Sequence, residues 1–228
     1  TVTLDGTAET TVPTGEGGYE SAAWKASFVN LLKYDADGNK INYTVEETTT
    51  YPGYTASPST PVSSGGTITN SQDETDADAT KAWKNADGST TAPSGASVEF
   101  TLYADGSATS YKVTLDGTAE TTAPTVTGGY ESAAWTATFV HLPMYKADGK
   151  TKIVYTVAET GTYAGYTASP TGAVASGKTI TNSQETTTAT ATKAWKNADG
   201  STTAPEGGSV VFTLVADGED TTYTVTLN

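Results

Sequence analysis

The chain repeats itself with a period of about 112 residues, which is the length of a whole domain rather than of one turn of a solenoid. The stretch GGYESAAWKASFVNL at residues 17–31 returns as GGYESAAWTATFVHL at residues 128–142. The stretch TKAWKNADGST at residues 80–90 returns unchanged at residues 192–202. The offset of the second pair is larger by one, so the second copy holds one extra residue. Any fold of this chain must accommodate the duplication.

The 228 residues therefore hold about two periods, and both ends of the chain resemble its middle. TVTLD at residue 1 matches KVTLD at residue 112 and TVTLN at residue 224. We expect a segment of a longer polypeptide that begins and ends within the same strand. The predicted parts are the C-terminal part of a first domain at 1–71, a junction at 72–80, a complete domain at 81–183, a second junction at 184–192 and the N-terminal part of a third domain at 193–228.

Short runs of alternating apolar and polar residues predict an all-β fold. Examples are SVEFTLYADG, WTATFVHL and KTITNS, and they are separated by Gly, Asp, Asn and Pro. No segment has the periodicity of a helix. Many short strands within each repeat, with turn signals this frequent, predict tandem β-sandwich domains.

Composition excludes several classes of function. The chain has 26 acidic and 12 basic residues, a net charge of -14, which disfavours nucleic acid and anionic membrane surfaces as partners. It has no cysteine, so neither disulfides nor thiolate metal sites stabilise it. No apolar run approaches the roughly 20 residues that span a bilayer. One histidine and no recognisable calcium loop leave no predicted metal site or cofactor.

Polar residues share strand faces with apolar ones at three places. Period-two alternation puts Lys81 on the same face as Trp83, Glu159 on the same face as Tyr155 and Val157, and Asn182 beside Ile180. The other copies repeat the pattern at Lys193 with Trp195, at Glu47 with Tyr43, and at Asn70.

Burying one ammonium or carboxylate alone is costly. One reading is that each polar residue lies at a strand end and reaches solvent, with the lysine extending past the tryptophan ring. The other is that the lysine, the acid and the amide lie together in the core.

The sequence resembles the collagen-adhesin B-type (Cna-B) domains of Gram-positive surface proteins and pilins. The resemblance rests on KAW at the start of the domain, FVHLPMYKADGKTKIVYTVAE in its second half and YTASPTGAVASGKTITN at its end. It implies tandem immunoglobulin-like β-sandwiches and an intramolecular isopeptide bond in each domain. Carried over by position, Lys81 is the nucleophile, Asn182 the electrophile and Glu159 the catalyst, with Trp83 and Tyr155 as core support. The corresponding residues of the other copies take the same roles: Lys193 and Asn70 in the cross-link, Glu47 as catalyst, and Trp195 and Tyr43 as core support.

The chemistry is consistent with elementary principles. Desolvation favours the neutral forms of an amine and of a carboxylic acid, and a neutral amine attacks a carbonyl carbon. The reaction would occur once in each molecule, so we predict autocatalytic maturation and not an enzyme.

The predicted function is a stalk or spacer repeat of an adhesin or pilus-like fibre, extracellular and anchored to the cell wall through other parts of the parent protein. The predicted partners are neighbouring repeats. Two alternatives remain at this point: a ligand-binding adhesin module, with Tyr19, Tyr51, Tyr130 and Tyr163 as glycan-stacking platforms, and an accessory module of a secreted enzyme.

The half-domains at the two ends leave three arrangements open. The chain is a window on a longer fibre, or Lys193 of one chain meets Glu47 and Asn70 of the next, or Lys81 turns back across the junction to Asn70. The distances from the Lys81 side chain to Asn182 and to Asn70 distinguish the last arrangement from the others.

Overall fold

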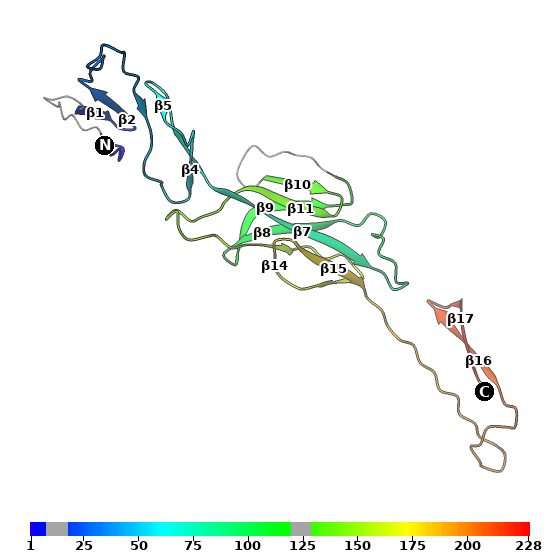
Figure 1. Ribbon diagram of the computed structural model, residues 1–228. Coiled ribbons are helices and arrows are strands. Elements are labelled where there is room, and N and C mark those ends of the chain that lie inside the picture. Colours follow the sequence, from blue (N-terminus) through cyan, green and yellow to red (C-terminus); the bar gives the residue numbers. More distant parts are fainter. Residues whose placement is uncertain (8–17, 120–128) are drawn as a thin grey trace. The chain divides into compact units, whose positions relative to one another are not determined.

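The structure is a computed structural model that describes residues 1–7, 18–119 and 129–228, and every helix or strand in this part is a β-strand (Figure 1). The all-β prediction is therefore confirmed. Residues 8–17 and 120–128, which fall within the predicted domains 1–71 and 81–183, lie outside the described residues. None of the described segments is a helix that would be long and apolar enough to cross a membrane.

The chain forms two compact units. One consists of Thr1–Glu74 together with Pro143–Ile153, and the other of Thr75–Leu142 together with Val154–Asn228.

The described part of the second unit contains a two-stranded hairpin at residues 210–227 and two larger sheets that share one core. The larger sheet has five strands in the order β10-β11-β7-β15-β13 and the smaller has four in the order β14-β12-β8-β9. The larger sheet consists of β10 (Gly129–Ala133), β11 (Thr136–Pro143), β7 (Glu74–Lys84), β15 (Lys178–Gln184) and β13 (Tyr166–Ser169). The smaller sheet consists of β14 (Val174–Ala175), β12 (Tyr155–Glu159), β8 (Val98–Ala104) and β9 (Ser107–Leu115).

One hydrophobic core joins the two sheets. The larger sheet contributes Trp83, Phe139 and Ile180, and the smaller contributes Phe100 and Val157, all of them buried. Buried and more exposed positions alternate around Trp83, Phe139 and Ile180, as the pleat of a β-strand requires. In the smaller sheet Thr101 and Ala158, which follow Phe100 and Val157, are buried as well. This is the predicted β-sandwich.

The pairing of β7 with β15 is parallel, whereas the other strand pairs with a known register in this sandwich are antiparallel. In this register Ile180 lies opposite Lys81, and Asn182 lies opposite Trp83. Because side chains two residues apart share a face, the Lys81 and Asn182 side chains lie diagonally across two neighbouring strands.

The first predicted junction differs from the structure. Residues 72–80 contain no bulky apolar side chain, which is why the sequence predicts a junction there, but β7 already begins at Glu74. Ala77 and Ala79 are completely buried in the core and alternate with partly exposed polar residues. Alanine is too small to give a visible hydrophobic signal in the sequence, yet it suits a position where two sheets approach closely.

A tight turn fixes the hairpin of β8 and β9. Asp105 and Gly106 both have positive φ angles, 49° and 80°, as a two-residue type I′ turn demands. The same turn, at Asp217 and Gly218, joins β16 (Val210–Ala216) to β17 (Glu219–Leu227). Both hairpins carry a register shift at the equivalent place, so the repeated sequence encodes the hairpin locally.

The first unit repeats the strand pairings of the sandwich but as separate two-stranded sheets. The three pairs have the same registers as β10-β11, β12-β14 and β13-β15, which β7 and β8 help to join in the sandwich. They are β1 (Gly18–Ala22) with β2 (Lys25–Val29), β3 (Thr44–Val45) with β5 (Val62–Ser63), and β4 (Tyr54–Ser57) with β6 (Thr69–Gln72).

Replacing Phe139 by alanine tests whether the core holds the sandwich together. The side chain is completely buried, so its loss should cost about 3–5 kcal/mol of unfolding free energy. Its counterpart Phe28 is only half-buried, so Phe28→Ala should cost less. Denaturant unfolding followed by tryptophan fluorescence measures both, and equal losses would contradict the assignment of the core.

Candidate functional site

Lys81 lies inside the sandwich and not at its surface. Its side chain has no exposed surface, and Trp83, two residues further along β7, is equally well covered. The lysine nitrogen Nζ lies 3.2 Å from Glu159 Oε2 and donates hydrogen bonds to the backbone carbonyls of Ala82 and Ile180 at 3.2 and 3.3 Å. The strand that carries Trp83 into the core therefore carries the lysine with it.

Glu159 connects Lys81 with Asn182 across the core. It is the last residue of β12, in the four-stranded sheet, whereas the other two residues lie on neighbouring strands of the five-stranded sheet. Its Oε2 contacts the lysine, and its Oε1 accepts a hydrogen bond of 2.8 Å from Asn182 Nδ2. The structure thus brings together the three residues that the sequence singled out.

Aromatic rings shield this group from water. Lys81 Nζ lies 4.7 Å from the centre of the Trp83 ring. Trp135, Tyr163 and Tyr166 each contact Trp83 edge-to-face, with ring centres 5.2–5.4 Å apart. A surrounding of this kind lowers the local dielectric constant, which strengthens the attraction between the lysine and the acid.

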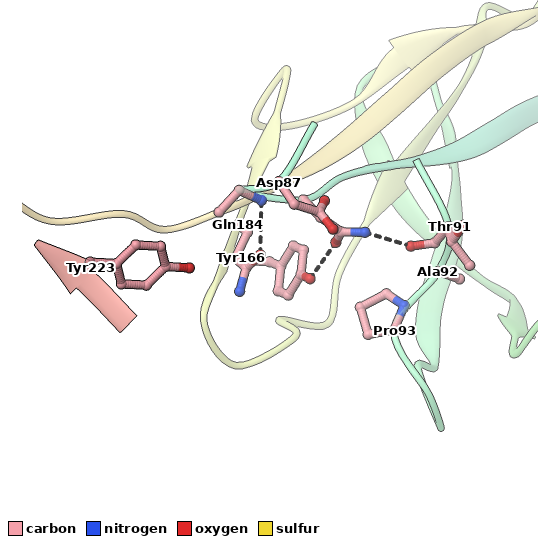
Figure 2. A pocket seen from close by; sticks show the side chains of 9 residues that line it. Asp87, Thr91, Ala92, Pro93, Tyr166, Gln184 and Tyr223 are labelled. Atoms are coloured by element: carbon pink, nitrogen blue, oxygen red, sulfur yellow. Dashed lines mark hydrogen bonds between the residues drawn. The ribbon is translucent and has the colours of Figure 1, made fainter. Parts of the chain in front are cut away.

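Tyr166 is held in place at the surface end of this aromatic group. Its hydroxyl donates a 2.6 Å hydrogen bond to Asn85 Oδ1, beside a surface hollow that Pro93 and Gln184 also line (Figure 2). Gln184 in turn accepts a hydrogen bond from the Ala86 backbone amide. These bonds connect the segment that follows β7 to the ends of β13 and β15.

Burial changes the acid–base behaviour of the lysine. Desolvation lowers the pKa of Lys81 below its ordinary value of 10.5, and the neighbouring Glu159 carboxylate opposes this effect only in part. Deprotonating Lys81 to the neutral amine therefore costs less free energy than deprotonating a lysine at the protein surface.

Three buried polar atoms at this site have no hydrogen-bond partner among the described residues: Glu159 Oε2, Asn182 Oδ1 and Trp83 Nε1. Glu159 Oε2 is compensated by its ion pair with Lys81, whereas the other two atoms have no such contact. Such buried atoms are rare and often mark a site where chemistry takes place. The unpartnered carbonyl oxygen belongs to the amide that the lysine would attack.

The counterparts of these residues in the other copies lie in more open surroundings. Asn70 donates a 3.1 Å hydrogen bond to Glu47, and both side chains are exposed. Lys193 lies 4.6 Å from the ring centre of a half-buried Trp195, as Lys81 does with Trp83, but it is exposed.

The two tyrosines assigned to core support differ as well. Tyr155 packs against the core, whereas Tyr43 is 36% exposed and donates a hydrogen bond to the Leu32 carbonyl. The hydrogen bond between the amide and the acid thus forms in both copies, but it is buried only in the copy that forms a complete sandwich.

The polar contacts of the Lys81 side chain all lie within residues 81–183. Its partners are Glu159 and two backbone carbonyls, whereas Asn70 is engaged with Glu47. This geometry favours Asn182 over Asn70 as the amide that Lys81 meets.

Three aromatic residues of the site are not recognisable from the sequence. Trp135 and Tyr166 give no signal, and Tyr163 stands out only as a glycan platform, because contacts between different strands leave no trace in the alternation of one strand. Of the other suggested platforms, Tyr19 and Tyr130 are half-buried and Tyr51 is 60% exposed. Among the described residues, no group of three or more His, Cys, Asp or Glu side chains is placed to hold a metal ion.

Comparison with known families agrees with this fold. The family model of the Cna protein B-type domain matches residues 1–71 and 77–183. The chain therefore belongs to the Cna B-type domain family, a non-enzymatic repeat family of surface adhesins, as the resemblance in the sequence indicated.

Two solved structures are similar to the chain, both from the collagen-binding surface protein Cna of Staphylococcus aureus. A single B repeat unit is 29% identical with a TM-score of 0.35, and the match covers 70% of this chain and 73% of that one. A pair of B repeat units is 30% identical with a TM-score of 0.38, and the match covers 89% of this chain and 48% of that one. The chain thus spans about half the length of the two-repeat structure. The search of curated proteins found no match.

The depressed lysine pKa predicts how stability depends on pH in a chain whose lysine stays free, such as Asn182→Ala. Between the lowered pKa of the folded state and pH 10.5, the unfolded state holds a proton on Lys81 that the folded state has lost. Stability should therefore rise with pH in this range, by at most about 1.4 kcal/mol per pH unit. Denaturant unfolding between pH 7 and 10.5 measures this slope. Adding Lys81→Met should reduce the slope, and an unchanged slope would contradict the depressed pKa.

Proposed function

We propose that the chain is a stalk segment of a bacterial surface adhesin or pilus-like fibre, in which Lys81 and Asn182 become joined by an isopeptide bond with Glu159 as catalyst. The observation that carries this proposal is the buried contact of Glu159 with both partners, at 3.2 and 2.8 Å. Membership of a family of surface adhesin repeats supports an extracellular location.

The reaction begins with a proton transfer within the ion pair. Lys81 Nζ gives a proton to Glu159 Oε2, which converts two charges into a neutral amine and a neutral acid without changing the net charge. The lone pair of Nζ is then free to attack Asn182 Cγ. Burial favours this step because neither neutral group needs the water that both ions have lost.

Glu159 also assists the amide. Once protonated, its carboxyl group is able to donate a hydrogen bond to Asn182 Oδ1 after a half-turn of the side-chain amide, and this bond polarises the carbonyl. Oδ1 has no other partner among the described residues.

The atoms balance when the amide nitrogen leaves as ammonium. A new bond forms between Lys81 Nζ and Asn182 Cγ, and the bond from Cγ to Nδ2 breaks. Two protons pass from Nζ to the leaving nitrogen through Glu159, which ends as the carboxylate it was at the start. One ammonium ion leaves for each bond formed, so the reaction happens once in each domain.

The bond would stabilise the domain and carry load. Closing a loop of about 100 residues is worth about 4.7 kcal/mol in the chain-entropy model, less any strain. Because β7 and β15 are the first and last strands of the domain and lie side by side in parallel, a pull on both ends of the domain passes directly from one to the other. The cross-link would then remove the residues between Lys81 and Asn182 from the path of the force.

The same proposal extends to the incomplete sites. Glu47 and Asn70 need a lysine-bearing first strand, and Lys193 needs an acid and an amide. We propose that neighbouring repeats of the same kind supply them, either within a longer polypeptide or from an adjacent chain placed head to tail.

Intact-mass spectrometry tests the cross-link directly. The mass should fall below the sequence value by the mass of one ammonia, about 17 Da, for the bond between Lys81 and Asn182. Glu159→Ala should abolish this loss because no group then takes the proton, and Lys81→Arg should abolish it while keeping the positive charge. A wild-type mass equal to the sequence value would remove the central claim.

Glu47→Ala is the matched control for the catalyst, since Glu47 makes the same hydrogen bond to an asparagine but forms no ion pair with a lysine among the described residues. This variant should lose ammonia as the wild type does. If Glu47→Ala abolished the mass change and Glu159→Ala did not, the cross-link would lie elsewhere.

A further inference from the structure

A loop of the second copy packs against residues of the first. Residues Pro143–Ile153 belong to the same compact unit as Thr1–Glu74. The backbone amide of Met144 donates a 2.9 Å hydrogen bond to the carbonyl of Asp73, and the loop closes on itself through a bond from the Ile153 amide to the Met144 carbonyl. This loop lies between β11 and β12, so it belongs to one repeat and contacts the end of the preceding one.

Two glycines make the contact possible. A Cβ atom on Gly149 would collide with the Pro52 carbonyl oxygen, and one on Gly53 would lie 3.0 Å from the Gly149 Cα atom. Any side chain at either position would separate the two backbones. The contact is therefore a close approach of main chains that only glycine allows.

The repeat supplies a second example of each glycine, and both are open. Gly165 is the counterpart of Gly53, with the same φ of 77°, and Gly38 is the counterpart of Gly149 in the same kind of turn. A Cβ atom on Gly165 or on Gly38 would meet no described atom within 4 Å. All four glycines have positive φ, which the turn alone can require. Of the four, only Gly53 and Gly149 lie close to the backbone of another segment.

We propose that this contact is a docking site between consecutive repeats, in which the loop of each repeat binds the end of the repeat before it. Gly165 then marks the same acceptor surface on the second copy, and its occupant is the corresponding loop of a following repeat. The acceptor surface includes the hollow lined by Tyr163, Ala164, Gly165 and Glu185, whose counterparts in the first copy are Tyr51, Pro52, Gly53 and Asp73.

The hydrogen-bonding groups around the acceptor are the same in both copies. Asp73 donates its amide to the Gly53 carbonyl and its side chain accepts from Thr55, while Glu185 makes the same two bonds with Gly165 and Thr167. The Glu185 carbonyl thus occupies, in the second copy, the position from which the Asp73 carbonyl accepts the hydrogen bond of the Met144 amide in the first. The contact itself does not depend on the proposed cross-link, but its mechanical value, a stalk that resists bending, rests on the proposed function.

Hydrogen–deuterium exchange of the Met144 amide in the full chain tests the contact. Gly53→Ala should raise the exchange rate of this amide at least tenfold, because the added methyl group pushes the loop away. Gly165→Ala should leave the rate unchanged. The two substitutions carry the same backbone strain, so only the neighbour distinguishes them. Equal exchange in the two variants, whether fast or slow, would overturn the proposal.

The loop offers a second matched pair. Gly149→Ala should also expose the Met144 amide, and Gly38→Ala should not. The Ile153 amide, bonded within the loop, reports whether the loop itself stays folded in the Gly53→Ala variant, where no loop residue is changed. Exposure of Met144 with Ile153 still protected supports docking, and protection of Met144 in both Gly53→Ala and Gly149→Ala refutes it.

A chain lengthened by a further copy of residues 117–228 after Asn228 tests the acceptor at Gly165. In this chain Gly165→Ala should expose the counterpart of the Met144 amide in the added repeat. An unaffected amide there would overturn the assignment of Gly165. Intact mass is read from the same samples, so failure of docking and failure of the cross-link are distinguished.

Discussion

The buried contact between Lys81 and Glu159 is the constraint on which the rest of the domain depends. An ammonium inside a sandwich must have a partner, and its partner here comes from the opposite sheet, 3.2 Å away. This requirement fixes β12 against β7 across the core and leaves the second carboxylate oxygen for Asn182. Removing the acid alone would leave an uncompensated charge in the core. Any packing of the two sheets that separates Lys81 from Glu159 is therefore destabilised in the same way.

The repeats and the strand alternation made much of this predictable. The shared face of Lys81 and Trp83 follows from period-two geometry, and so does that of Ile180 and Asn182. The sequence does not contain the contact between the sheets, because nothing in YTVAE says that Glu159 lies over the lysine. The cost of burying a lone charge left two readings open, and the family resemblance favoured the one in which the three residues meet. The start of β7 was missed because Ala77 and Ala79 are small, and the docking glycines were missed because a glycine in a turn looks the same with or without a neighbour.

The two copies form an internal comparison of sequence and surroundings. The hairpins and their turns recur with the same registers in both copies, so they are encoded locally. The stretch TKAWK does not behave in this way, because it is part of β7 at residues 80–84 but forms no strand at residues 192–196. Burial does not recur: Phe28 and Phe139 occupy equivalent places, yet only Phe139 lies in a closed core. The difference follows the presence of β7 and β8 between the other strands, which shows that a β-sandwich becomes stable through its long-range pairings.

The hairpins β8–β9 and β16–β17 have the same turn and register, which makes them interchangeable parts during folding. Glu159 pairs with Phe100, which precedes it, and Phe212, the counterpart of Phe100, follows it at a similar separation along the chain. The loop-closure entropies for these two separations differ by only about 0.1 kcal/mol, so chain length does not select the correct hairpin. The order of synthesis selects the correct hairpin, because β8 leaves the ribosome before β12 and β16 leaves it afterwards. A domain that closes before β16 is made excludes the swapped pairing to which tandem repeats are prone.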